Sequence, residues 1–211
     1  MSTLSRRLLL AFAALGLGAA SMSSVVHYRL LTTPGYTSFC DVNATVSCTQ
    51  AYLSPYGSFA GVPVAVAGVF FFLLIFLLVA IGGGEKSRVR ESVPGYVFAL
   101  STIGLAFALY LAWASYFQLK TFCMLCAVTY VAVIALFIIS GGATTFPMTT
   151  LPRRAPRDFR TLFSSPIALI LALLYLAGAG SVFAYFPSEA PPAQTPAALP
   201  PLSDQQRADL V

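Results

Sequence analysis

The residues of this sequence best suited to chemistry are its four cysteines, which form two pairs. Cys40 and Cys48 are separated by seven residues, and Cys123 and Cys126 form a C-x-x-C motif. The tighter spacing is usual for redox-active dithiols, in which the thiolate is the species that attacks a disulfide. Two such pairs within reach of one another can pass two electrons along a chain. The cysteines therefore predict thiol–disulfide exchange.

Two other uses of four cysteines stay open. A tetrahedral zinc site takes four thiolates, but structural zinc sites hold their ligands in polar knuckles, whereas an apolar run follows Cys126. Two static disulfides are the second alternative, although a C-x-x-C is too tightly spaced to close a long loop. We keep static disulfides as the main alternative to redox exchange.

The composition places these cysteines in a membrane protein. Of the 211 residues, 58% are hydrophobic and 9% are charged, whereas about a quarter of a soluble domain is charged. The mean hydropathy is +0.82. A soluble globular fold is thereby excluded. The net charge of +5 does not indicate nucleic-acid binding, because the cations fall in short clusters between apolar runs.

Five apolar segments are long enough to cross the hydrocarbon core of a bilayer, which takes about 20 residues of helix. They cover residues 8–26, 62–81, 95–117, 123–139 and 162–186. We expect an all-α integral membrane protein, a four-helix transmembrane bundle plus a fifth, peripheral transmembrane helix. The outer loop, residues 30–60, should lie over the mouth of the bundle as a lid.

The basic residues predict which side of the membrane each loop faces. Nine of the twelve lie within residues 6–7, 86–90 and 153–160, in the tail and loops that alternate to one side. The positive-inside rule makes that side cytoplasmic. The N-terminus is then cytoplasmic, and all four cysteines lie on the extracytoplasmic side, where disulfides form and persist.

The domain organisation is simple. Residues 1–186 form the transmembrane domain, and residues 187–211 are rich in Pro, Ala and Ser and predict a disordered extracytoplasmic tail. The N-terminus, two arginines before an apolar stretch, also fits a signal peptide cleaved near Ala19, Ala20 and Ser21. Either interpretation delivers the outer loop to the same face.

The motifs, taken in order, resemble those of the vitamin K epoxide reductase family. The resemblance rests on Cys40-Asp41, on Cys48 at C-x7-C spacing, on Ser54 six residues later, on the C-x-x-C motif, and on Tyr130 four residues after its second cysteine. It covers roughly residues 8–140, and the combination is specific where a C-x-x-C motif alone is not.

The resemblance implies a role for each of these residues. The C-x7-C pair forms a shuttle that takes electrons from a partner dithiol, Cys123 exchanges with Cys48, and Cys126 faces a quinone. Ser54 and Tyr130 line the quinone pocket. The implied activity is that of a membrane thiol–quinone oxidoreductase, which reduces menaquinone, ubiquinone or a related quinone and drives disulfide formation in secreted proteins.

The resemblance is closer to bacterial members than to animal ones. Animal members use an asparagine near the outer end of the second span, where residues 61–66 here read Gly-Val-Pro-Val-Ala-Val. An unmodified quinone is therefore expected rather than an epoxide. Five spans also fit bacterial members, which implies a bacterial cytoplasmic membrane. With no fused thioredoxin-like domain in this chain, the partner should be a separate thioredoxin-like extracytoplasmic protein.

Two competing hypotheses come from other protein classes. The unrelated disulfide oxidases of bacterial inner membranes also carry two cysteine pairs, but there the C-x-x-C precedes the wider pair, and the order here is reversed. The other hypothesis is a non-enzymatic membrane scaffold whose outer loop is held by static disulfides. Redox titration separates it from an electron relay.

Three further features have weaker predicted roles. His27, the single histidine, is expected as an interfacial residue at the outer membrane surface. Asp41 either raises the pKa of the Cys40 thiol by repelling its thiolate or caps a helix, and both interpretations stay open. The phenylalanines at 70–72 could hold the ring and tail of a quinone, but a phenylalanine run in a span more often faces lipid or packs in the core, and no site role is assigned to them.

Overall fold

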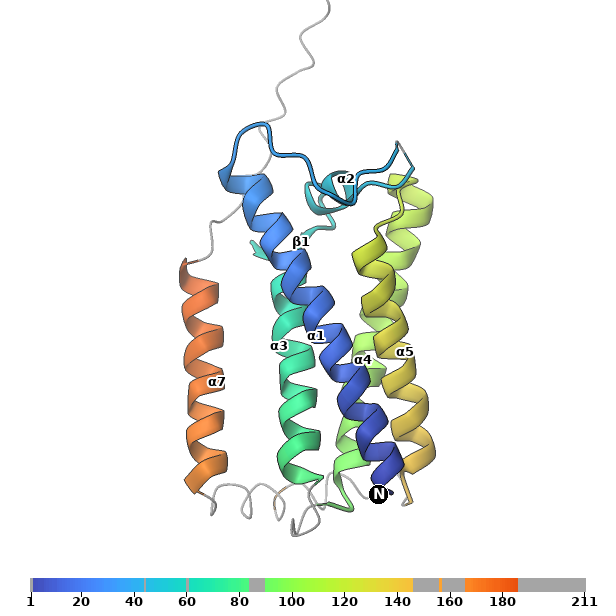
Figure 1. Ribbon diagram of the computed structural model, residues 1–211, viewed down its shortest axis with the longest axis vertical. Helices are drawn as coiled ribbons and strands as arrows, with labels where there is room; N and C mark the ends of the chain where they lie inside the picture. Colours follow the sequence, from blue (N-terminus) through green and yellow to red (C-terminus); the bar gives the residue numbers. More distant parts are fainter. Residues whose placement is uncertain are drawn as a thin grey trace, which may run out of the picture.

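The computed structural model describes residues 2–43, 45–59, 61–83, 90–145, 156 and 166–185. Within these residues four helices are long and apolar enough to cross a membrane, and Figure 1 shows them side by side. They are α1 (Thr3–Thr32), α3 (Val64–Leu77) continued by the π-helix η1 (Leu78–Gly82), α4 (Val93–Trp113) continued by the π-helix η2 (Ala114–Leu119), and α5 (Met124–Ala143). The expected all-α transmembrane bundle is confirmed.

The helices begin and end a few residues from the expected positions. The first begins earlier, since the hydroxyl of Ser2 accepts a hydrogen bond from the Ser5 amide and caps it. The second begins at Val64 rather than at residue 62, because the short strand β2 (Val62–Pro63) pairs antiparallel with β1 (Ser58–Phe59). The polypeptide thus enters this helix from a small hairpin.

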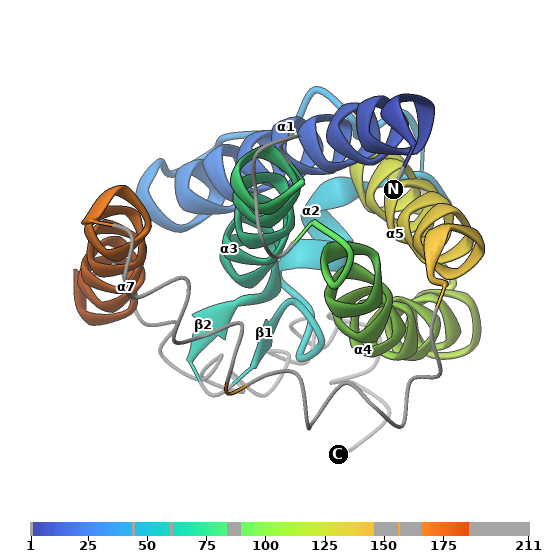
Figure 2. The same ribbon diagram turned by 90° about the horizontal axis from the view of Figure 1, so that it is seen from below.

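Helix α1 lies against both α3 and α5 (Figure 2). It contributes Leu9 and Ala13, both fully buried, to the hydrophobic core. Gly16 of α1 allows the ring of Phe72 to approach so closely that a Cβ at this position would collide with it. Helix α1 is therefore part of the core of the bundle.

The fifth helix, α7 (Pro166–Tyr185), stands at the edge of the bundle beside α3 (Figures 1 and 2). The hydroxyl of Tyr175 donates a hydrogen bond to the carbonyl oxygen of Phe70 at 3.0 Å, and the two rings meet edge to face. The apolar stretch of α7 is Leu169–Val182, and several of its leucines are exposed. The helix is peripheral, as expected, but among the described residues four other helices are the candidate spans, so its crossing of the membrane stays a prediction. The predicted disordered tail lies outside the described residues.

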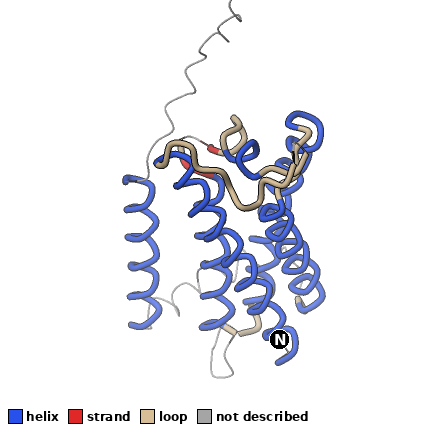
Figure 3. Tube along the Cα trace, turned by 45° about the horizontal axis from the view of Figure 1, so that its top comes forward, coloured by secondary structure: helices blue, strands red, loops and turns tan. Residues whose placement is uncertain are grey.

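The loop between α1 and α3 crosses the end of the bundle opposite the N-terminus (Figure 3). It contains the short helix α2 (Cys48–Tyr52). Two contacts attach it to the turn between η2 and α5. The Phe122 amide donates to the Thr45 carbonyl at 2.7 Å, and the Thr121 hydroxyl donates to the side-chain oxygen of Gln50 at 2.6 Å. These contacts hold α2 over the start of α5.

Candidate functional site

The two cysteine pairs meet where α2 reaches the start of α5. Cys40 and Cys48 are joined by a disulfide, and Cys48 is the first residue of α2. Cys123 caps the N-terminus of α5 as a free thiol. The sulfur of Cys48 lies 3.6 Å from that of Cys123, and both residues are buried. A single thiol–disulfide exchange between Cys48 and Cys123 can therefore connect the outer pair to the inner pair.

Asp41 organises the loop that carries the outer pair. Its carboxylate accepts hydrogen bonds from the Ser38 amide at 3.1 Å, the Ser47 hydroxyl at 2.8 Å, and both the amide and the hydroxyl of Thr49. Burial raises the pKa of Asp41, but the bonds from Thr49, Ser47 and Ser38 outweigh it and lower the pKa to about 2. Of the two interpretations left open above, the geometry supports the helix cap.

The hydrogen bonds of Cys123 favour ionisation of its thiol. Its sulfur accepts a hydrogen bond from the Cys126 amide at 3.3 Å, and its S–H donates to the Tyr52 hydroxyl at 3.6 Å. Hydrogen bonding to the Cys126 thiol, then to the backbone and to Tyr52, lowers the pKa of Cys123 to about 7 against the opposing effect of burial. A cysteine at a helix N-terminus is thereby a nucleophile near neutral pH.

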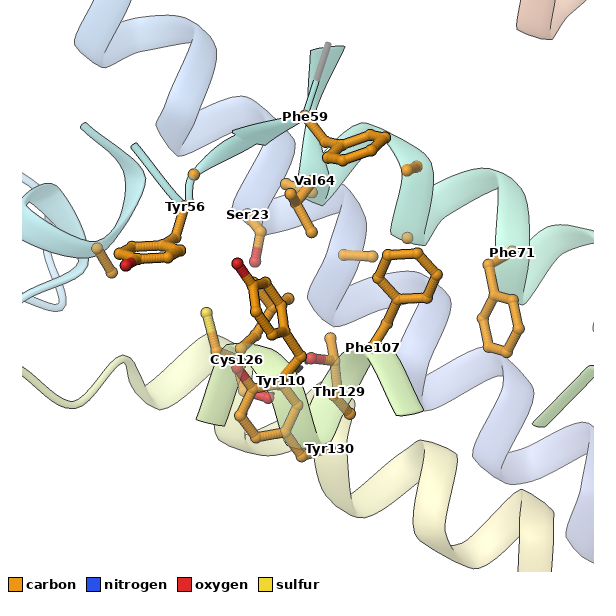
Figure 4. Close-up of a pocket in the computed structure, with 18 of the residues that line it drawn as sticks. Ser23, Tyr56, Phe59, Val64, Phe71, Phe107, Tyr110, Cys126, Thr129 and Tyr130 are labelled. Carbon is orange, nitrogen blue, oxygen red and sulfur yellow. Dashed lines mark hydrogen bonds between the residues drawn. The ribbon is translucent and has the colours of Figure 1, made fainter. Parts of the chain in front are cut away.

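A cavity of about 510 Å³ lies below α2, between the four long helices. Its walls are mainly apolar, with Phe71, Phe72 and Phe107 among them. Cys126 also lines it, and Figure 4 shows its sulfur directed toward the space beside Ser23 and Tyr56. Small-molecule sites are typically about 300–1,000 Å³, mostly apolar, with a few polar groups. The volume and the lining suit a quinone ring.

Tyr130 lines this cavity, one helical turn after Cys126 on α5. Ser115 belongs to the π-helix η2 and lines the cavity as well. Single turns of π-helix occur frequently at functional sites. The π-helix thus places the hydroxyl-bearing residue Ser115 in the wall of the same cavity as Tyr130.

Ser54 lies behind the cavity wall. It is not among the described residues that line the cavity. Its hydroxyl donates to the Ala51 carbonyl at 2.7 Å and accepts from the Tyr56 amide at 3.3 Å, so it shapes the turn after α2. This turn carries Ala51, Tyr52 and Tyr56 to the cavity.

The structure places four residues where the sequence did not put them, namely His27, Tyr52 and the pair of phenylalanines at 71–72. The prediction that His27 is interfacial is wrong: because α1 extends to Thr32 and α2 covers its last turns, His27 is fully buried and stacks on Tyr52 at 5.5 Å. Tyr52 itself had no predicted role, although its position four residues after Cys48 was an available signal. Phe71 and Phe72 line the cavity, which a run of phenylalanines in a span does not reveal.

Comparison with known proteins agrees with this site. The model of the vitamin K epoxide reductase family matches residues 7–141, which include all four cysteines and Tyr130. Vitamin K epoxide reductase complex subunit 1 of Rattus norvegicus is 26% identical over 143 residues, which are 64% of this chain and 87% of that protein. The chain therefore belongs to the vitamin K epoxide reductase family and is a multi-pass membrane oxidoreductase of disulfide and quinone chemistry.

Proposed function

We propose that this protein oxidises the dithiol of a thioredoxin-like extracytoplasmic partner at Cys40 and Cys48, passes the electrons to Cys123 and Cys126, and reduces a quinone in the cavity. One observation carries the proposal. The sulfur of Cys48 lies 3.6 Å from that of Cys123, while Cys126, on the other side of the inner pair, lines the cavity. The inner pair thus has one cysteine toward the donor and one toward the acceptor.

The electrons move in two exchanges. The partner dithiol reduces the Cys40–Cys48 disulfide and leaves as a disulfide. Cys48 then attacks Cys123 in the oxidised inner pair, releasing the Cys126 thiolate, and Cys40 attacks Cys48, releasing Cys123. The products are a Cys40–Cys48 disulfide and an inner dithiol. This is the arrangement of the structure, in which the outer pair is bonded and the inner cysteines are free.

The cavity supports a quinone as the acceptor. A bound quinone would accept two electrons and two protons. Cys126 and Tyr130 lie in its wall, so a thiol and a phenol can reach the same ring. The segment where animal members carry an asparagine contributes Val62, Val64 and Ala65 to the lining. Without an amide there, we propose menaquinone, ubiquinone or a related unmodified quinone rather than an epoxide.

The proposed location is a bacterial cytoplasmic membrane, with the N-terminus inside and the cysteines outside. In support, the loop and the start of α5 share the bundle end opposite the N-terminus (Figure 1). Phe39 and Val42, on either side of the Cys40-Asp41 dipeptide, are exposed and offer an apolar contact to a separate thioredoxin-like partner.

The test is quinone reduction by the purified protein in detergent, driven by a dithiol and followed by ultraviolet absorbance. Cys126→Ser should abolish turnover, and Tyr130→Phe should lower it by about 10-fold to 100-fold, the scale of one lost catalytic hydrogen bond or proton donor. Tyr116→Phe, at a tyrosine 76% exposed, is the matched control and should turn over like the wild type.

Failure of the folded wild type to reduce any of several quinones would favour the static scaffold instead. A redox titration completes the comparison. Static disulfides have potentials below about −300 mV, whereas a relay must cycle under mild dithiols.

A further inference from the structure

Tyr52 occupies the centre of the site, although neither its residue type nor its spacing assigned it a role. It is the last residue of α2, four residues after Cys48, and its side chain is 5% exposed. Its hydroxyl accepts the hydrogen bond of the Cys123 thiol at 3.6 Å. Its ring stacks on that of His27, with 5.5 Å between centroids. The hydrogen bond from Cys123 and the stacking on His27 together fix the position of the hydroxyl.

The same side chain lines the cavity. Ser23 and Cys126 line it too. Cys123 is not among the described residues that line the cavity. The Tyr52 hydroxyl is thus a polar bridge from the sulfur of Cys123 into the space proposed for the acceptor.

We propose that Tyr52 is a catalytic residue, whose hydroxyl carries the proton of the Cys123 thiol into the cavity as the inner pair is oxidised. The inference deepens the proposed function and rests on it. It answers how Cys123 loses its proton, since this thiol is buried beneath α2 and faces the outer disulfide rather than the cavity.

The step balances in electrons and protons. In the inner pair two S–H bonds break and one S–S bond forms, and the quinone takes two electrons and two protons to become hydroquinone. One proton comes from Cys126, which is itself in the cavity wall. The other leaves Cys123 for the oxygen of Tyr52, while Tyr52 releases its own hydroxyl proton into the cavity. Tyr52 ends the cycle in the form in which it began.

A phenol suits this transfer because it accepts and donates at once. Burial, followed by the proximity of Cys126 and Cys123, raises the pKa of Tyr52, so the hydroxyl stays protonated and both transfers must occur together. The titratable groups facing this hydroxyl and the Cys123 sulfur come from each element packed around them. They are His27 of α1, and Cys126 and Tyr130 of α5. Cys48 of α2 is held in its disulfide and does not titrate.

The experiment uses Tyr52→Phe, which keeps the ring and removes only the hydroxyl. Protein with a reduced inner pair and an intact outer disulfide is mixed with a quinone, and single-turnover hydroquinone formation is followed in H₂O and D₂O. We expect the rate to fall by about 100-fold and the solvent isotope effect to change, as for loss of a general acid–base group. Tyr36→Phe, at a tyrosine packed against the same cysteine cluster, is the matched control and should keep both values.

A second measurement needs no quinone. Brief alkylation of the same protein across a pH series, with mass spectrometry of the Cys123 peptide, reports the ionisation of that thiol. The Tyr52 hydroxyl accepts from the Cys123 thiol but can donate to the thiolate, so its loss should raise the midpoint by about one pH unit. Should Tyr52→Phe fail to fold, fluorotyrosine at position 52 keeps the phenol, and the single-turnover rate should follow its acidity.

The outcomes separate the two proposals. A wild-type rate, isotope effect and alkylation midpoint in Tyr52→Phe would overturn the role of Tyr52 and leave the proposed function intact. A rate that does not change along the fluorotyrosine series would overturn it as well. Absence of hydroquinone with the wild type itself would overturn the proposed function and, with it, the transfer of a proton to a quinone.

Discussion

The sulfurs of Cys48 and Cys123 lie 3.6 Å apart although 75 residues separate them in the chain. The contact follows from how the outer loop is attached. Phe122, immediately before Cys123, is bridged to Val46 of the loop, and Thr121 is hydrogen-bonded to Gln50 of α2. Each attachment lies within two residues of one of the sulfurs. Anything that loosens the loop should therefore slow exchange before it affects the cavity.

Removing Cys40 should trap the exchange intermediate. In Cys40→Ser, Cys48 has lost its partner and can still attack Cys123, so a Cys48–Cys123 disulfide should accumulate on mild oxidation. Mass spectrometry of a non-reduced digest would identify the linked peptides. The double variant Cys40→Ser/Cys123→Ser is the control and should not give this cross-link. Linkage of Cys48 to Cys126 instead would contradict the proposal that Cys123 exchanges with the outer pair and Cys126 faces the quinone.

Thr121→Val should slow the outer exchange selectively. The change removes the 2.6 Å hydrogen bond to Gln50, worth about 1 kcal/mol, and loosens α2 over α5. Steady-state turnover with a dithiol should fall several-fold. It should fall more than the single-turnover rate at which pre-reduced protein reduces a quinone, a step that depends on α2 through the contact of Tyr52 with Cys123. Thr102→Val, on the exposed face of α4, is the matched control. An equal loss in both assays would show that the contact supports the whole bundle instead.

The order of the loop should depend on the ionisation of Asp41. The pKa of Asp41 is lowered to about 2 by its hydrogen bonds, against about 3.9 in an unfolded chain. Stabilisation by the carboxylate is therefore complete above pH 4 and is lost as the pH falls toward 2. Pepsin, which is active over this range, should cleave the wild-type loop increasingly as the pH falls.

Asp41→Asn should make the loop sensitive to pepsin already at pH 4. The neutral amide has one oxygen and cannot accept all of the hydrogen bonds that the Asp41 carboxylate accepts. Glu91→Gln, just before α4, is the matched change of a carboxylate to an amide outside the loop. It should leave the cleavage profile of the wild type unaltered. Identical profiles for all three proteins would refute the assigned role of Asp41.

Gly16→Ala should destabilise the bundle by about 1–3 kcal/mol, the usual cost of overpacking. The added methyl group meets the ring of Phe72, which is buried and lines the cavity. Thermal unfolding in detergent measures the loss, and the KM for quinone should rise because Phe72 is displaced. Gly18→Ala, on the same helix with open space around its Cβ, is the control and should be neutral or stabilising. Equal melting temperatures for the two variants would contradict the α1–α3 packing.

Ser54→Ala distinguishes two roles for this serine. If its hydroxyl supports the turn through Ala51 and Tyr56, its loss should lower stability by about 1 kcal/mol and impair both the exchange and the quinone step. If the hydroxyl binds quinone as the resemblance implies, KM should rise with the melting temperature unchanged. Thermal unfolding and quinone kinetics on the same preparation decide between these outcomes.

Much of the fold was predictable because a bilayer leaves few choices. A run of about 20 apolar residues must form a helix to satisfy its backbone, so the four long helices followed from hydropathy. The peripheral place of the fifth helix was expected because it falls outside the resemblance to the animal members of the family. The ends of the helices were less predictable, since a serine cap at Ser2 and the hairpin before Val64 are local features that hydropathy does not report. The two π-helices were not predictable for the same reason.

By itself the sequence determined the class of chemistry. Two cysteine pairs, an apolar chain and the order of the motifs specified a membrane protein with thiol–disulfide chemistry, because cysteine spacing and helix periodicity are local properties. Only the tertiary structure decided which groups meet. The contact of Cys48 with Cys123, the burial of His27 and the position of Tyr52 between a thiol and a cavity depend on α2 docking over α5. That docking joins residues more than 70 positions apart, and no periodicity within one segment encodes it.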